Sequence, residues 1–457
     1  MRKQLRYVDV IKGVPEYQEF LTVNELKESS QALAQMHPDV VELFQVGAST
    51  SGEPINALRV GNGKLKALLI GFPHPNEPIG SLTIEYLSKR LAEDDELRED
   101  LGFTWYFIKA ADIDGARLNE GWFKGKYDNI KHMLNFYRTP GYRQIEWTFP
   151  VEYKTLKWNS PSPETKAVMN LIDETRPDLV FTLHNSAFGG VYYYVSDPCP
   201  ALYPKLQNLA KSERLPLHLG EPESPYMKKL FDGVFLLPMM NGIYDFYEKH
   251  SERDPATFLN HGTNTMEYAK RACNAFTIIC EMPYIYDKRI GDTKSTDMIR
   301  REAILKSIEI SDDVFEFVNT AYNRLGQLLD SESPFQDVIA EYLKHYKPQR
   351  DAMKRWAETD KTLERPATVS EVFSNLVIKK YYSMRLIGQF IRLLDDSEEL
   401  HPELEELETE RKAFLNKLRS MNSEFEKDSE YEIIPIQKLV RVQVGTALSV
   451  ADSLLKE

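Results

Sequence analysis

The chain has 457 residues, of which 42% are hydrophobic and 28% are charged, and its formal net charge is -13. This is the composition of a folded globular protein, and the length exceeds the size at which one hydrophobic core usually stops growing. The net acidic charge argues against a nucleic-acid partner or an anionic membrane, because both require clustered Lys and Arg.

The N-terminal stretch MRKQLRYVDVIKGVPEYQEF has no apolar run of signal-peptide length, and no apolar run elsewhere is long enough to span a bilayer. Cys199, Cys273 and Cys280 are odd in number and lack the Cys-x-x-Cys spacing of metal sites, a pattern typical of reduced thiols. We therefore expect a cytoplasmic protein without a membrane partner.

From about residue 20 to 295, short apolar runs rich in β-forming residues alternate with helical patterns. In chain order these segments are LKALLIGF, SLTIEYLSKRLAE, FTWYFIKAAD, KAVMNLIDET, DLVFTLHN and AFTIICEMPY. The alternation predicts an α/β fold with a mostly parallel mixed sheet flanked by helices.

After about residue 295 the pattern becomes helical, in MIRREAILKSIEISDDVFEFVNTAYNRLGQLL and again in SEVFSNLVIKKYYSMRLIGQFIRLLDD. The first segment has apolar residues at helical spacing, namely Ile304, Ile308, Phe315, Val318, Tyr322, Leu325 and Leu329. We therefore predict two parts, an α/β domain over residues 1–295 and an α-helical C-terminal region over residues 296–457.

Polar residues that carry chemistry lie at the ends of four predicted strands. His74 and Glu77 follow LKALLI, His184 closes DLVFTLH, Glu281 closes AFTIICE, and Arg117 comes soon after FTWYFIKAA. The carboxyl ends of parallel strands lie at one edge of a sheet, where open α/β sheets bind their ligands. We therefore expect these side chains to converge.

A second His-x-x-Glu pair, His218 and Glu221, lies in LPLHLGEPESP. No long strand pattern precedes it and no helix pattern follows directly, so we interpret it as a chance occurrence of a short motif.

Two histidines and one carboxylate can hold a zinc ion and leave one position open for water, as in catalytic sites. The metal lowers the pKa of that water and polarises a carbonyl group. A second carboxylate can then act as general base, and an arginine such as Arg117 can stabilise the oxyanion.

At these residues the sequence resembles the zinc carboxypeptidase family, over about residues 20–290. The segments that carry the resemblance are QVGASTSGEPINALRVG, HPNE, IDGARLN, SPETKAV, TLHNS and TMEYAKRACNAFTIICE. The resemblance implies that His74, Glu77 and His184 bind one zinc ion and that Glu281 is the catalytic base. It also implies that residues 1–295 form the catalytic domain.

Digestive members of the family bind the C-terminal carboxylate of a peptide with an Asn-Arg pair, but the matching stretch QIEWTFP has Glu146 and Trp147 there. Arg138 or Arg143, in NFYRTPGYRQ, could bind the carboxylate through two hydrogen bonds instead. The alternative is that both are ordinary loop arginines.

Two further substrate-binding candidates come from the same resemblance. Met266 falls in the segment that forms the side-chain pocket of the family, which argues against a strongly basic substrate side chain. The mobile tyrosine of the family would fall near Leu259, and His261 is close enough to replace it, unless it is a solvated loop histidine.

The function that we predict is zinc-dependent hydrolysis of an amide bond by a metallocarboxypeptidase acting on short peptides or peptide-like substrates. A zinc-dependent N-acyl amino acid deacylase is the first alternative, and a non-catalytic binding or scaffold protein is the second. The helical region could cover the catalytic cleft, or it could make a homo-oligomer interface.

Overall fold

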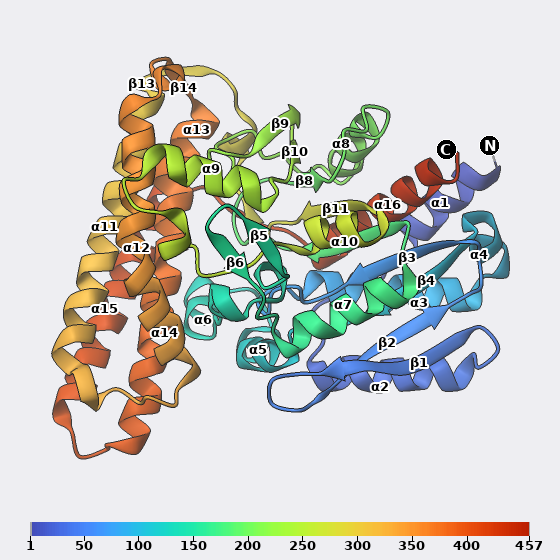
Figure 1. Ribbon diagram of the computed structural model, residues 1–457, viewed down its shortest axis with the longest axis horizontal. Coiled ribbons are helices and arrows are strands. Elements are labelled where there is room, and N and C mark those ends of the chain that lie inside the picture. Colours follow the sequence, from blue (N-terminus) through green and yellow to red (C-terminus); the bar gives the residue numbers. More distant parts are fainter. Residues whose placement is uncertain (1, 457) are drawn as a thin grey trace.

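The computed structural model describes residues 2–456 and is built around one nine-stranded sheet, in the order β1-β2-β4-β3-β7-β11-β8-β10-β9 (Figure 1). The strands are β1 (Val41–Ala48), β2 (Pro54–Val60), β3 (Leu65–Ile70), β4 (Phe103–Ile108), β7 (Leu179–His184), β8 (Tyr192–Val195), β9 (Lys228–Phe231), β10 (Val234–Leu236) and β11 (Phe276–Glu281).

The four central strands, β4, β3, β7 and β11, run parallel to one another, whereas β1, β2 and β8 join the sheet antiparallel. Every residue of β7 is buried, as expected for a parallel strand covered on both faces. The predicted fold class is therefore confirmed, and the four apolar runs quoted above are these central strands. The sequence pattern did not mark the edge strands, which are short or only partly buried.

Helices cover both faces of the sheet. One face carries α1 (Arg2–Lys12), α2 (Val23–Met36), α3 (Ile79–Glu93), α4 (Asp95–Leu101), α8 (Tyr203–Ser212) and α16 (Ile436–Leu454), and the other carries α7 (Pro163–Thr175) and α10 (Thr265–Cys273) (Figure 1). The helix start signals are local. Ser162 caps α7 by accepting from the backbone N–H of Thr165, and Pro163 is the first helical residue.

The predicted helical region is present and packs beside the sheet (Figure 1). Its helices are α11 (Arg300–Leu325), α12 (Pro334–Thr359), α13 (Val369–Phe373), the π-helical turn η8 (Ser374–Ile378), α14 (Lys379–Leu400) and α15 (Glu405–Asp428). Shorter elements connect the two parts: α5 (Ile113–Asn119), α6 (Asn129–Leu134), α9 (Met240–His250), and the strand pairs β5 (Val151–Tyr153) with β6 (Leu156–Trp158), β12 (Ile285–Tyr286) with β15 (Glu432–Ile433), and β13 (Ser295–Ile299) with β14 (Pro366–Thr368).

The last helix does not stay with the helical region. α16 returns to the sheet and lies beside α1 and α3, which brings the two ends of the chain together (Figure 1). Its apolar face is buried, and it includes Leu439, Val440, Val444, Leu448 and Ala451. The α/β layer thus contains both the start and the end of the chain.

One hydrophobic core runs from the sheet into the helical region. Phe188, in the loop after β7, contacts the rings of Phe373, Tyr381 and Phe425 at centroid distances of 5.5, 5.5 and 5.3 Å. Among residues 2–456, no helix is both long and apolar enough to cross a membrane.

Candidate active site

His74 and Glu77 lie in the short loop of residues 71–78, between the end of β3 and the start of α3. The loop is tight. Phe72, whose ring is buried, has a φ of 47°, in the left-handed region that few non-glycine residues adopt. Gly80 lets α3 approach β7 closely, because a Cβ there would lie 2.5 Å from the Cβ of Leu183. The loop is therefore held against the strand that ends in His184.

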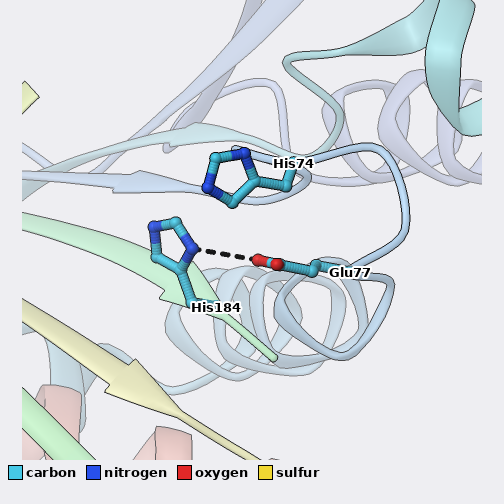
Figure 2. Close-up of side chains that lie close together, drawn as sticks. All are labelled: His74, Glu77 and His184. Carbon is cyan, nitrogen blue, oxygen red and sulfur yellow. Dashed lines mark ion pairs between the residues drawn. The ribbon is translucent and has the colours of Figure 1, made fainter. Parts of the chain in front are cut away.

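The side chains of His74, Glu77 and His184 point toward one another (Figure 2). Each offers one ligand atom, these atoms lie within 4.8 Å of one another, and all three residues are buried. Nδ1 of His184 is 2.9 Å from Oε2 of Glu77. Nδ1 of His74 and Nε2 of His184 are buried without a hydrogen-bond partner among the described residues. Buried polar atoms in this state are those expected to ligate an ion.

The protonation of the two histidines differs. Burial lowers the pKa of His74 well below its usual value, helped by the positive charge of Arg138, so the imidazole is neutral and able to bind a metal. Burial also opposes the charge on His184, but the carboxylates of Glu77, Glu146 and Glu281 hold its pKa well above the usual value. A metal ion would take the place of that proton.

Residues that sequence reasoning missed hold the ligand-bearing backbone in place. Oδ1 of Asn185 accepts from the backbone N–H of Ile79 at 3.0 Å and from the hydroxyl of Tyr284 at 3.2 Å, which ties the loop to the end of β7. Nε2 of Gln443, on α16, donates to the carbonyl of His184 at 3.1 Å. The signal for Gln443 was one amide in the apolar run VQVGTALSV.

Two more carboxylates lie beside the triad. Oε1 of Glu281, the last residue of β11, is 3.8 Å from Nδ1 of His184. Oε1 of Glu146 is 3.8 Å from the other ring nitrogen, Nε2, and accepts from the hydroxyl of Thr265 at 3.0 Å. Burial raises the pKa of Glu281 well above its usual value. Both carboxylates line the same cavity as the triad.

The structure brings Arg138, but not Arg117, to the triad. Nη1 of Arg138 donates to Oε1 of Glu77 at 2.9 Å and to Oδ1 of Asn76 at 3.1 Å. Arg117, on α5, instead pairs with Glu53, in the turn between β1 and β2, at 2.7 Å, and the described cavity lining does not include it. Arg117 lies in α5 rather than at the end of β4, and its side chain points to the turn between β1 and β2.

The other substrate-binding candidates lie behind the cavity wall. Arg143 pairs with Asp337 at 3.1 Å, and its side chain is 42% exposed. His261 packs against the ring of Trp147 at 5.3 Å, and of these two residues it is Trp147 that lines the cavity. Met266 is buried in an apolar cluster behind the wall, with Tyr194 and Ile279.

The cavity has a volume of about 680 Å³ and contains the triad at its floor. The helical region closes one side of it, with Ile308 from α11, Tyr346, Met353 and Trp356 from α12, and Lys379 and Arg385 from α14. The helical region therefore contributes part of the cavity wall, which is one of the two roles that the sequence left open. A concave site of this kind admits short chains more readily than folded proteins.

The second His-x-x-Glu pair also lines this cavity, but it is structural. Nε2 of His218 lies 2.8 Å from the carbonyl oxygen of Glu221, and the Glu221 carboxylate pairs with Arg300 at 2.6 Å. Among residues 2–456, the group able to hold a metal is His74, Glu77 and His184.

The family model for zinc carboxypeptidases matches residues 26–254, half of the chain. The chain therefore belongs to the zinc carboxypeptidase family. No sequence among the curated proteins matches it.

Solved structures of that class resemble the chain. They include carboxypeptidase A from Helicoverpa armigera, with 14% identity and a TM-score of 0.38 over 79% of this chain and 82% of that one. Bovine thrombin-activatable fibrinolysis inhibitor, in complex with tick carboxypeptidase inhibitor, has 11% identity and a TM-score of 0.36 over 75% and 98%. The metallo-carboxypeptidase from Burkholderia cenocepacia has 16% identity and a TM-score of 0.32 over 57% and 60%.

Family membership implies a zinc ion, and the residues present fit one. A buried set of two imidazoles and one carboxylate, with an unpartnered nitrogen on each of His74 and His184, is the donor set of a catalytic zinc site. The chain is thus an enzyme of this family with a candidate His-Glu-His zinc site.

Proposed function

We propose that the protein is a zinc-dependent carboxypeptidase that removes the C-terminal residue from short peptides or peptide-like molecules. The observation that carries the proposal is the buried His74, Glu77 and His184 group beside Glu281, in a cavity partly walled by helices. When bound there, zinc would supply an activated water and a Lewis acid.

Within this proposal, Glu281 moves the proton. Its carboxylate faces the site, accepts a proton from the attacking water and returns it to the departing amine. The Glu281 side chain is itself buried, which keeps its carboxylate directed at the water that attacks.

We assign the oxyanion-stabilising role to Arg138 in place of Arg117. The Arg138 guanidinium is beside the triad, where charge develops on the attacked carbonyl, whereas Arg117 is neutralised by Glu53. Oriented cationic donors at such a position typically contribute most of the stabilisation of the developing charge.

A deacylase of N-acyl amino acids is the second candidate. It is favoured by Glu146 and Trp147 in the places where digestive members have an Asn-Arg pair, and by the pairing of Arg143 with Asp337. The proposed cytoplasmic location is supported by Cys199, Cys273 and Cys280, which are free thiols. Self-association through the helical region stays a prediction.

The test combines elemental analysis of the purified protein with two substrate sets. Peptides with free and amidated C-termini form the first set, and N-acyl amino acids form the second. We expect one zinc per chain and release of the terminal residue from free-carboxylate peptides alone. Hydrolysis of N-acyl amino acids without peptide cleavage would transfer the assignment to the deacylase. Absence of both zinc and hydrolysis would support the non-catalytic alternative.

A further inference from the structure

Helix α14 is fastened to the catalytic site. The hydroxyl of Tyr382 accepts from the backbone N–H groups of Ala187 and Phe188, at 3.2 and 3.4 Å, in the loop that follows the zinc-ligand candidate His184. Seven residues further along α14, Gln389 accepts from the backbone N–H of Arg138 at 3.2 Å. α14 therefore runs along the cavity and contacts the loops on both sides of the triad.

Lys379 is an unpaired cation on this helix. It lines the cavity, and among the described residues its side chain has no ion pair or hydrogen bond. Burial lowers the pKa of its ammonium group, and no carboxylate opposes that effect. A desolvated ammonium without a counter-charge is unfavourable, so binding of an anion beside it lowers the free energy of the site.

Arg385 is a second cation without a carboxylate partner. Its guanidinium stacks on the rings of Phe136 and Tyr382, at 4.6 and 4.3 Å, and its buried Nε has no acceptor among residues 2–456. The stacking fixes the plane of the guanidinium and leaves its edge for a planar anion.

Other arginines of the cavity differ in this respect. Arg350 pairs with Asp312 at 2.5 Å, and Arg138 pairs with Glu77 at 2.9 Å. Among these cavity-lining cations, Lys379 and Arg385 are thus the pair that no carboxylate of the described chain neutralises.

The position of the two cations is set by the helix. Lys379 precedes Tyr382 by three residues and Arg385 follows it by three, so all three lie on one side of α14 and line the cavity. The π-helical turn Ser374–Ile378 ends just before Lys379, and such turns recur at functional sites.

The cavity also contains carboxylates without a cationic side chain bonded to them among the described residues. Glu146 and Glu281 lie beside the triad, and the Glu223 carboxylate accepts from the hydroxyl of Tyr192. An anionic group of a substrate is repelled from these carboxylates and attracted to the two cations on α14. The charge distribution therefore orients a substrate that has one anionic end.

We propose that Lys379 and Arg385 bind the terminal carboxylate of the departing residue, so that the helical region supplies the specificity-determining part of the site. The proposal rests on the proposed function and names its carboxylate subsite. It replaces the sequence-based candidate Arg143, whose charge is taken by Asp337.

The first experiment measures binding without hydrolysis. The probes are 3-phenylpropanoate and the uncharged 3-phenylpropan-1-ol, which contain no peptide bond, and the dissociation constants are measured by calorimetry on the zinc-loaded protein. We expect Lys379→Met and Arg385→Met each to weaken binding of the carboxylate by about 10- to 100-fold, the loss typical of a charge-assisted hydrogen bond. Binding of the alcohol should change less than about twofold.

Lys380→Met is the matched control. Lys380 is the neighbour of Lys379 on the same helix, but its ammonium pairs with Asp428 on α15 at 2.7 Å. Removing this exposed pair should leave carboxylate binding unchanged. Equal weakening in Lys379→Met and Lys380→Met, or unchanged binding in both Lys379→Met and Arg385→Met, would overturn the proposal.

The second experiment distinguishes binding of the C-terminal carboxylate of a substrate from binding of a side-chain carboxylate. The substrates are N-benzoyl-glycyl-phenylalanine and N-benzoyl-glycyl-glutamic acid α-amide, which has only a side-chain carboxylate. We expect Arg385→Met to raise the KM for the first peptide at least tenfold with a smaller change in kcat. An effect confined to the second peptide would overturn the assignment to the terminal carboxylate. If neither peptide is cleaved by the unaltered protein, the proposed function fails, while the binding experiment still tests the subsite.

Discussion

Glu281 and His74 have separable roles at the residue scale. Glu281 is a carboxylate beside the triad rather than a member of it, while His74 offers a ligand atom. We expect Glu281→Gln to retain about one zinc per chain and to lower kcat by about 10²- to 10⁴-fold, because the proton acceptor is lost. Metal analysis and steady-state kinetics on the same preparation check both statements.

His74→Ala is the counterpart, and it should purify without zinc. The exposed His401, with a side chain 44% exposed, gives the control His401→Ala, which should keep both metal and activity. An active Glu281→Gln protein would exclude Glu281 as the base, and undiminished zinc in His74→Ala would contradict the ligand assignment.

Arg138 and Arg117 can be distinguished by substitution. Arg138 contacts the ligand candidate Glu77, whereas Arg117 pairs with Glu53 away from the cavity. We expect Arg138→Gln to lower kcat by about 10²- to 10³-fold, because a donor to the developing oxyanion is removed. Arg117→Gln should lower kcat by less than about threefold, since it breaks a half-exposed ion pair. A larger loss of kcat in Arg117→Gln than in Arg138→Gln would assign the stabilisation of the oxyanion to Arg117.

At the scale of elements, the contact between α14 and α6 decides whether the cavity wall is in place. Gly388 on α14 lies so close to α6 that an added Cβ would be 2.1 Å from the carbonyl oxygen of Met133. We expect Gly388→Ala to destabilise the protein by about 1–3 kcal/mol, because the helix must shift. Urea unfolding measures this change, and a raised KM should accompany it.

Gly242 on α9 provides the control for this substitution. A Cβ there meets only Pro238 at 3.5 Å, an ordinary contact, and the residue is also helical. Gly242→Ala should therefore be neutral or slightly stabilising. A Gly388→Ala protein as stable as Gly242→Ala would show that the packing of α14 on α6 is not tight.

At the scale of the whole molecule, the stability of the α/β layer depends on α16, which comes from the C-terminal end of the chain. A chain ending at residue 295 lacks α16 and uncovers the apolar surface of α3, which α16 contacts. We expect such a chain to lose its cooperative urea transition and to bind hydrophobic dyes. Circular dichroism and dye fluorescence measure these changes.

The truncated chain is compared with a second variant, in which a linker replaces most of the helical region and α16 is kept. Tyr286 of β12 pairs with Glu432 of β15, so a short Gly-Ser linker replacing residues 288–430 keeps α16 attached. This chain should unfold more cooperatively than the one ending at residue 295. If the shorter chain unfolds with the midpoint of the full protein, the predicted boundary at residue 295 marks an independent domain.

The local pattern was sufficient for the central strands and the metal ligands. Apolar runs at β3, β7 and β11 marked buried parallel strands, and His74, Glu77, His184 and Glu281 follow or close them. Hydrophobic periodicity is a property of neighbouring residues, and parallel strands necessarily bring their carboxyl ends to one edge. These positions could therefore be predicted without a structure.

Only the tertiary structure decided which distant residues complete the site. Arg117 and Arg138 both follow β4 in the sequence, yet Arg117 pairs with Glu53 in the turn between β1 and β2, whereas Arg138 pairs with the ligand candidate Glu77. The helical pattern of α14 did not indicate that Arg385 faces the cavity, nor that α16 returns to place Gln443 against His184. These contacts join residues far apart in the chain, and they depend on how helices pack rather than on any local sequence signal.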